Sequence, residues 1–507
     1  MFGAVTLTAA FLFADNALNS PYPWLNHDVS FLSYAGSELL KGSRLYVEFQ
    51  EMNPPGAHFL QEGILGVAAT LGVSEFLLTH LFVLALGIAG ILMLRWVYRD
   101  GGESQRFIFV TLAYALVVVR GNFSNNVVPS APAIPYDFGQ RDHLFTLLFL
   151  PYLLWRISSR RASIFVYPYL VLLGYVAVWK PYWPLLLVAV ELYLAIRRRQ
   201  GSFRAWAALA VGMMLPYGIL LLHSHESFQA FFGDVVPLIL GGAYSHYGMA
   251  FSEFMVSPLH LQMLMGGLIL VLIWWICIRQ RFLDRPSLFL ILAVTGGSYL
   301  IYTVQQKFWS YQGMLFFGTV VVLGSFLLAT ALKRLTRGDA QFWIVSVLAI
   351  MFLIVLGSGL RNLKLMLDHF PPKGQELVPL LEDYDKVMFF STGSDYSYAP
   401  VRLRIETVGP WREHFRLPAL LAIEDPERRA RALDDYAREV SMRIERTRPD
   451  LLLFAPLGLG LPPGRHIHDV FREHGAIPDG SYRRIPDDTL SSQDLRLVGW
   501  IVYRRFQ

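Results

Sequence analysis

The sequence predicts an all-α polytopic membrane bundle followed by a small α/β domain outside the cytoplasm. Three observations lead to this prediction. Of the 507 residues, 54% are apolar and 16% are charged, whereas soluble domains carry about 25% charged residues. Apolar runs of spanning length recur through residues 1–360, and residues 361–507 hold 44 of the 83 charges. This composition excludes a soluble globular enzyme and a disordered chain.

The predicted membrane domain, residues 1–360, contains about eleven apolar runs, and a spanning helix needs about 20 residues. The runs lie at 3–19, 75–97, 107–120, 141–157, 163–179, 181–196, 203–222, 258–278, 286–303, 311–332 and 341–359. With Met1 in the cytoplasm, the basic clusters at the ends of these runs all fall inside, as the positive-inside rule requires. Sixteen Lys and Arg residues then lie inside and six outside. We therefore interpret the net charge of +5 as a topology signal and expect no nucleic-acid partner.

Residues 56–73 form a further apolar stretch, but a span there would turn the later basic clusters outward. We expect this stretch to lie along the outer interface or to dip partway into the membrane, where polar side chains on its first turns suit an interfacial helix. The first outer loop then covers residues 20–74, and an odd number of spans places residues 361–507 outside. For the first run, a cleaved signal peptide is the alternative.

The second predicted domain, residues 361–507, has the pattern of a small α/β fold. Short apolar segments at 386–390, 450–454 and 497–503 predict buried strands, and the charged segment 425–447 predicts a helix that ends before Pro449. It has no Gly-rich phosphate loop, so we interpret it as a lid or docking module without catalysis. The single cysteine of the chain, Cys277, allows no disulfide within one chain.

The first outer loop carries the most informative pattern. It runs from an acid (Asp28) through a helix-like segment to Lys41-Gly42, then Tyr46, then Glu51 ahead of Asn53-Pro54-Pro55. Asp28 is a candidate general base, because a carboxylate can take a proton from an attacking hydroxyl. Asp is also a favoured helix cap, which is the structural alternative for this residue.

This loop resembles the first outer loop of GT-C-type glycosyltransferases, and it is most similar to the protein O-mannosyltransferase and lipid A aminoarabinose transferase group. There the loop runs acid, short helix, "G…Y" and an "(E/N)-x-P-P" entry into an apolar helix. The string LGVSEFLLTH at 71–80 also resembles the segment that comes next in that group. The resemblance covers residues 20–100; the remainder matches only in its alternating spans and extracytoplasmic tail.

The resemblance implies an enzyme that takes a sugar from a polyprenyl-phosphate carrier on the outer face of a bacterial inner membrane. Asp28 would then be the base, Tyr46 would contact substrate, and Glu51 would position the acceptor or help to bind a divalent metal, Mg or Mn. For Glu51 an exposed loop carboxylate is the alternative. The third outer loop contains His-Ser-His-Glu at 223–226, which lacks the spacing of a helical zinc motif. The need for a metal is left open.

Arg141, Asp142 and His143 stand at the start of a predicted span, where three consecutive ionisable residues are costly unless they face a polar cavity. Arg141 is a candidate ligand of the donor phosphate, because its guanidinium forks onto phosphate. Asp142 would pair with Arg141 or act catalytically beside Asp28, and His143 would contact substrate. Snorkelling to the interface with a local ion pair is the alternative.

Lys180 and Lys307 are conspicuous because basic residues are scarce on the outer side. Lys180 precedes Pro181 in an aromatic hairpin, where the resembled family has a lysine in a "T-K-G-P" string, although this chain lacks the Gly. Either lysine is a candidate ligand of a polyprenyl phosphate. Trp309 and Tyr311 beside Lys307 would stack on a sugar, or they belong to an ordinary interfacial aromatic belt.

The favoured function is an inverting glycosyltransferase, hexosyl or pentosyl, that modifies a lipopolysaccharide or polysaccharide of the cell envelope or another glycan, lipid or protein acceptor. A transporter or flippase of a lipid-linked sugar is the alternative, and it would show internal repeats or broken helices at mid-membrane depth. A receptor or scaffold would leave the acids of the first loop unexplained.

Overall fold

The computed structural model describes most of the chain. The described residues are 2–21, 23–48, 51–99, 104–120, 137–158, 163–198, 202–240, 248, 250–306, 310–335, 343, 347, 367, 372, 374–392, 396–408, 414, 416–456, 461, 465–477, 481–486 and 500–506. The chain forms two compact units. The first consists of Met1–Asn26, Ala68–Pro216 and Met249–Phe370, and the second of His27–Val67, Tyr217–Gly248 and Pro371–Gln507.

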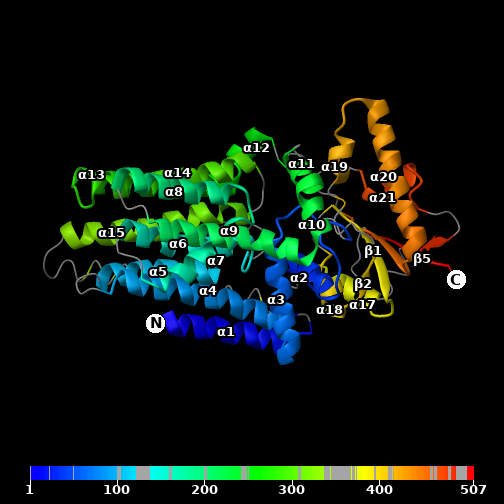
Figure 1. The fold of residues 1–507 in the computed structure, drawn as a ribbon, viewed down its shortest axis with the longest axis horizontal. Helices are drawn as coiled ribbons and strands as arrows, with labels where there is room; N and C mark the ends of the chain where they lie inside the picture. The colour runs from blue at the N-terminus through cyan, green and yellow to red at the C-terminus, as the bar shows by residue number, and fades with distance from the viewer. Residues whose placement is uncertain are drawn as a thin grey trace. The chain divides into compact units, whose positions relative to one another are not determined.

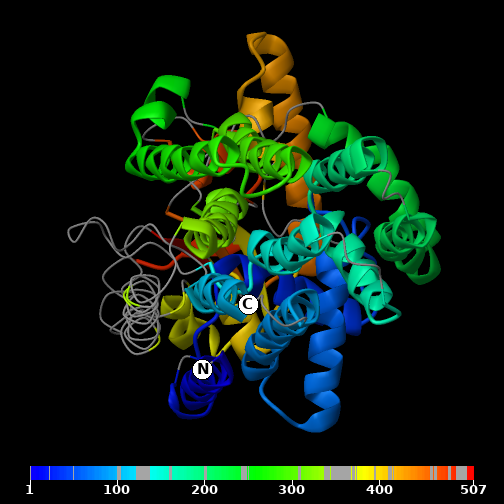
Figure 2. The same cartoon turned by 90° about the vertical axis from the view of Figure 1, so that its left-hand side faces the viewer.

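The first unit is a bundle of helices that run side by side (Figure 1), and Figure 2 shows the same helices nearly end-on. They are α1 (Phe2–Asn19), α4 (Glu75–Val97), α5 (Ser104–Arg120), α6 (Arg141–Ser158), α7 (Val166–Ala177), α8 (Tyr182–Arg198), the larger part of α9 (Phe203–His223), α12 (Phe251–Val256), α13 (Pro258–Arg279), α14 (Arg285–Gln305), the short 3-10 helix η4 (Ser310–Gly313) and α15 (Met314–Leu335).

Helix α6 forms the centre of this bundle, because it is buried from Asp142 to Ile157. It packs against α4, α7 and α15. Two tyrosines tie its backbone to neighbouring helices: the hydroxyls of Tyr114 and Tyr169 donate to the carbonyls of Leu147 and Leu148, both at 2.7 Å. These bonds satisfy buried hydroxyls, which would otherwise lose their hydration without compensation.

A fully bonded carboxylate joins three helices at the other end of α6. Glu191 on α8 lies 2.8 Å from Nε of Arg156, and it accepts from the Tyr152 hydroxyl at 2.5 Å and the Trp206 indole N–H at 2.9 Å. The side chains of Arg156 and Glu191 are only 6% and 4% exposed. A charge buried so deeply requires this full set of partners, so α6, α8 and α9 are held in one arrangement.

Several helix ends follow from local sequence. Ser74 accepts from the backbone N–H of Leu77 at the start of α4, and Asp284 does the same for Ser287 at the start of α14. Among the described residues, four helices are long and apolar enough to cross a membrane: Glu75–Val97, Phe203–His223, Arg285–Gln305 and Tyr311–Leu332. These helices are consistent with a polytopic membrane bundle, while the count of eleven spans stays a prediction.

The second unit contains a helical part and a small sheet. The helical part comprises α2 (His27–Leu40), α3 (Gly56–Leu71), the short π-helix η2 (Phe231–Val235), α10 (His225–Ala230) and α11 (Val236–Leu240). Helices α2 and α3 approach closely at Gly36, where an added Cβ would lie 2.7 Å from the backbone nitrogen of Glu62. A larger residue at this position would therefore push the two helices apart.

Within the described part of the chain, the sheet has five strands in the order β2-β1-β3-β5-β4. The strands are β1 (Lys386–Phe390), β2 (Glu406–Thr407), β3 (Leu451–Phe454), β4 (Tyr482–Arg484) and β5 (Ile501–Arg505). Strand β1 pairs in parallel with β2 and β3, and β5 pairs antiparallel with β3 and β4. The predicted strands at 386–390 and 450–454 are thus confirmed, and β5 covers the described part of the third.

One face of the sheet packs on α20 (Pro426–Thr447) and α21 (Ile467–Glu473), where Val440, Phe454 and Phe471 form part of the apolar core. Asp425 caps α20 by accepting from two backbone N–H groups. Shorter helices complete the domain: η5 (Gln375–Leu377), α17 (Val378–Leu381), α18 (Tyr398–Leu403) and α19 (Arg416–Leu421). The predicted α/β character of this part of the chain is confirmed.

Candidate functional site

A buried ion pair lies at the start of the central helix of the first unit. Nζ of Lys180, in the turn between α7 and α8, lies 2.5 Å from Oδ2 of Asp142 on the first turn of α6. The two side chains are 11% and 3% exposed. Removing both charges from water is costly, and the short, direct contact offsets part of that cost. Because Asp142 lies on the first turn of α6, the pair fixes the position of the ammonium group relative to this helix.

Aromatic rings surround the ammonium group of Lys180. Its Nζ lies 4.8 Å from the ring centre of Tyr311, 5.6 Å from that of Trp183 and 5.9 Å from that of Tyr182. Ring faces attract cations at these distances. Trp183 is held by a parallel stack on Phe145 with centres 4.4 Å apart. Lys180 and Tyr311 are separate candidates in the sequence, and the fold brings them together.

Of the other candidates at this end of α6, His143 is fully buried, and both ring nitrogens have protein partners. Nδ1 accepts from the backbone N–H of Gly139 at 3.1 Å, and Nε2 lies 3.0 Å from the carbonyl of Val117. An Nε2–H tautomer satisfies both contacts, so His143 ties the turn before α6 to α5. Arg141 is half-buried at the first position of α6. Substrate or phosphate contacts for these two residues stay predictions.

Two further candidates, Lys307 and Trp309, lie outside the described residues. Gln305, just before them, accepts from the hydroxyl of Tyr182 at 3.1 Å. The end of α14 is therefore anchored beside one of the aromatic residues that surround Lys180.

In the second unit, Asp28 lies in the first turn of α2, which begins at His27. The alternative that Asp28 caps the helix is therefore modified. Its carboxylate lies inside the first turn and not before it, where it still interacts favourably with the positive end of the helix. Oδ1 of Asp28 lies 3.5 Å from Nε2 of His27, and the two side chains are 19% and 18% exposed. A half-buried carboxylate beside an imidazole is a suitable proton acceptor.

Glu51 is buried, with 3% exposure, so the alternative of an exposed loop carboxylate is wrong. Its Oε1 accepts from the backbone N–H groups of Met52 and Asn53 at 2.8 and 2.7 Å and from the Asn53 amide at 2.5 Å. The hydroxyl of Tyr46 donates to the carbonyl of Asn53 at 2.6 Å, and Tyr46 itself adopts a positive φ of 68°. Glu51 and Tyr46 together fold the end of this loop.

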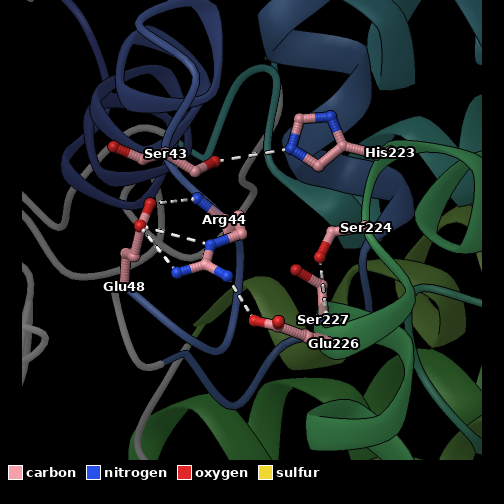
Figure 3. A network of polar contacts seen from close by, with 7 residues as sticks. All are labelled: Ser43, Arg44, Glu48, His223, Ser224, Glu226 and Ser227. Atoms are coloured by element: carbon pink, nitrogen blue, oxygen red, sulfur yellow. Dashed lines mark hydrogen bonds and ion pairs between the residues drawn. The ribbon is translucent and has the colours of Figure 1, made fainter.

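A polar network links the same loop to residues 217–248 of the second unit. In Figure 3, Arg44 donates to Glu48 from its backbone N–H and its side chain, and another guanidinium nitrogen pairs with Glu226. Nε2 of His223 lies 3.4 Å from the carbonyl oxygen of Ser43. The backbone N–H of Arg44 holds the pKa of Glu48 below its usual value, with help from the guanidinium and against partial desolvation. The His-Ser-His-Glu segment thus contributes to packing of the loop.

The described residues contain no group of three or more His, Cys, Asp and Glu side chains that could hold a metal ion. This finding does not test the expectation of a divalent metal, Mg or Mn, because a metal held together with phosphate oxygens and water needs only one or two protein carboxylates; that expectation stays a prediction.

The comparisons with known proteins concern the fold. No protein-family model matches the chain, and no curated protein matches it. Among solved structures, it is similar to ArnT from Cupriavidus metallidurans bound to undecaprenyl phosphate, with 14% identity, a TM-score of 0.57, and coverage of 99% of this chain and 97% of that one. ArnT from the same organism in the apo state gives 13% identity, a TM-score of 0.52 and coverage of 99% and 96%. The chain thus shares the fold of ArnT over nearly its whole length, in agreement with the resemblance drawn from the first loop.

Proposed function

We propose that the chain is a membrane glycosyltransferase that moves a sugar from a polyprenyl-phosphate donor to an acceptor hydroxyl on the extracytoplasmic face of the membrane. The observation that carries the proposal is the likeness in fold, over 99% of the chain, to ArnT bound to undecaprenyl phosphate. The ammonium of Lys180, held on α6 by Asp142 among aromatic rings, supports it independently.

Lys180 is proposed to bind the phosphate of the donor. An ammonium has three N–H donors, so contact with Asp142 leaves the group able to donate to a phosphate oxygen as well. Because the ion pair is buried, a phosphate placed there interacts with the cation more strongly than it would in water. As the sugar–phosphate bond breaks, negative charge grows on the phosphate, and a fixed cation stabilises that charge. Arg141 and Lys307 are proposed as further phosphate ligands.

Asp28 is proposed as the general base. The acceptor oxygen forms a bond to the anomeric carbon while the bond from that carbon to the phosphate oxygen breaks, and the hydroxyl proton passes to the Asp28 carboxylate. Polyprenyl phosphate leaves with the electron pair of the broken bond. One direct displacement inverts the configuration at the anomeric carbon. Tyr46, His143, Trp309 and Tyr311 are proposed to contact the substrates, and Glu51 is proposed to hold the loop.

The proposal includes a multi-pass location in the bacterial inner membrane, with residues 361–507 on the periplasmic side. The apolar helices support membrane insertion, and the basic clusters at the ends of the apolar runs support the orientation.

The experiment is a transfer assay with the full-length chain reconstituted in liposomes that contain lipid extract from bacterial membranes. Mass spectrometry follows the lipid-linked sugars and the extracted glycolipids and glycans. The expected result is loss of a polyprenyl-phosphate sugar, appearance of free polyprenyl phosphate and a matching mass gain on an acceptor. Movement of an intact lipid-linked sugar between the leaflets, with no bond cleavage, would instead establish the flippase alternative.

A further inference from the structure

A cavity of 680 Å³ lies at one end of the sheet in the C-terminal part of the chain. Ligand sites of small molecules have volumes of about 300–1,000 Å³. Charged and aromatic residues dominate its lining, with the arginines all contributed by β4 and β5: Asp383, Tyr384, Asp385, Asp450, Arg483, Arg484, Arg504, Arg505 and Phe506. The proposed transfer reaction assigns no role to any of them.

Two of these arginines stand opposite each other across the strands. Arg483 on β4 and Arg504 on β5 are directly paired in the antiparallel register. Like charges at such a position repel each other and destabilise the strand pair. The guanidinium carbon of Arg483 lies 3.6 Å from the ring centre of Phe506, in close contact, and that of Arg504 lies 5.7 Å from the ring centre of Tyr384, within the range of a cation–π attraction. Within the described part of the chain, neither guanidinium has a hydrogen bond or ion pair.

One acid of the cavity lining, Asp450, already has partners within the protein. Asp450 pairs with Arg505 at 3.1 Å and accepts from the backbone N–H of Lys386 at 3.2 Å. Arg505 also donates to the carbonyl of Arg448 at 2.6 Å. This pair is therefore part of the framework of the cavity. The guanidinium groups of Arg483 and Arg504 are not part of this framework. The two other aspartates of the lining, Asp383 and Asp385, are exposed.

We infer that this cavity binds a phosphate group, with Arg483 and Arg504 as its principal ligands. The planar guanidinium of Arg483, held over the Phe506 ring, presents its N–H groups along its own edges, where they can fork onto two oxygens of one phosphate. An anion between the paired arginines removes their repulsion and fixes their long side chains. The size of the cavity admits more than the phosphate alone, which fits a phosphorylated saccharide or a lipid headgroup. The inference does not depend on the proposed transfer reaction.

The test measures binding of inorganic pyrophosphate to the full-length protein in neutral detergent by titration calorimetry, at constant ionic strength. The wild-type chain is expected to bind, and Arg483→Gln with Arg504→Gln is expected to weaken binding at least about tenfold, since hydrogen bonds to charged groups are involved. Arg431→Gln with Arg438→Gln removes the same charge from exposed positions on α20 and is expected to leave binding unchanged.

Two outcomes would overturn the inference. One is no detectable binding by the wild-type chain, and the other is equal weakening by the two double variants, which would show a general charge effect. Arg483→Lys with Arg504→Lys keeps the charge without the fork and is expected to bind at an intermediate level, which guards against misreading a folding defect. The thermal midpoint of each variant is measured alongside.

Nanodiscs of different lipid composition distinguish a lipid headgroup from a soluble phosphorylated saccharide as the ligand. If a lipid headgroup occupies the cavity, phosphatidylglycerol in the disc competes and weakens pyrophosphate binding by the wild-type chain relative to discs of phosphatidylcholine. If a soluble phosphorylated saccharide is the ligand, glucose 6-phosphate competes with pyrophosphate in both kinds of disc. Either result supports the phosphate site, and competition that persists in the double Gln variant contradicts it.

Discussion

Asp142 and Lys180 are 38 residues apart in the chain, and their side chains meet at 2.5 Å at the start of α6, where both are buried. Each is costly to bury alone. Together they place a cation, at a fixed position, among three aromatic rings. This arrangement is the basis of the proposed phosphate site, and it makes a prediction about stability that is independent of activity.

Replacing Lys180 by Met leaves the Asp142 carboxylate buried without its cation. Loss of one partner of a buried pair costs about 3–5 kcal/mol, so the thermal midpoint of Lys180→Met should fall clearly below that of the wild-type chain. Adding Asp142→Leu removes the stranded charge and should recover part of the loss. Thermal unfolding of the purified chain in detergent measures both. If the double variant is as unstable as Lys180→Met, or less stable, the two groups are not coupled.

Asp28→Asn keeps the shape of the side chain and removes its basicity. General base catalysis contributes about 10²–10⁴-fold, so sugar transfer should fall by that factor. Stability should change by no more than about 1 kcal/mol, the usual effect of an acid in a first turn. Glu75→Gln is the matched control, because Glu75 is also a first-turn acid, on α4. Transfer at the wild-type rate by Asp28→Asn would remove Asp28 from the mechanism.

Glu51 is predicted to act through the fold of the first loop. Glu51→Ala removes an oxygen that accepts three hydrogen bonds, and it should cost about 2 kcal/mol or more. Glu51→Gln retains an acceptor and should retain most of the stability and transfer. Glu48→Ala in the same loop removes an exposed acid and should cost less than about 1 kcal/mol. Wild-type stability for Glu51→Ala would contradict the anchoring role.

His414 should make the C-terminal part of the chain sensitive to acid. Burial lowers the pKa of this imidazole from 6.5 to about 3, against the opposing effect of a backbone hydrogen bond. The ring stacks on Phe390, and its Nδ1 lies 2.8 Å from the hydroxyl of Tyr436. Between pH 6.5 and 3 the unfolded chain binds a proton at His414 that the native chain does not, so stability falls as pH falls, by about 1.4 kcal/mol per pH unit.

The measurement is the thermal midpoint of the full-length chain between pH 6.5 and 4. His414→Gln has no charge to acquire, and its midpoint should fall less steeply with acid than that of the wild-type chain. Parallel slopes for wild type and His414→Gln would show that another group controls the acid response.

The main elements of the fold follow from local sequence signals. The apolar run at 75–97 coincides with α4, and the charged segment at 425–447 coincides with α20 and its Asp425 cap. Strands β2 and β4 were not predicted, because two and three residues are too short to show a period of two. These strands exist through pairing with β1 and β5, which a sequence window does not contain.

The candidate site was predicted as a set of residue types and not as a set of contacts. Asp142 was expected to pair with Arg141 or to act beside Asp28, whereas the structure pairs it with Lys180. That contact depends on how α6 and α7 pack, which no local pattern encodes. Glu51 was weighed as an exposed carboxylate because its neighbours are polar and Pro-rich, and its burial arises when the loop folds back on its own backbone.

The most direct test of the account is the affinity of the purified full-length chain for undecaprenyl phosphate, measured by native mass spectrometry in neutral detergent. The account predicts that the wild-type chain binds one molecule. Lys180→Arg should retain measurable binding, Lys180→Met should lose at least about tenfold, and Lys41→Met, which removes an exposed lysine paired with Glu38, should bind as the wild-type chain does. Binding by Lys180→Met as tight as that of the folded wild-type chain, or no binding by the wild-type chain, would contradict the account.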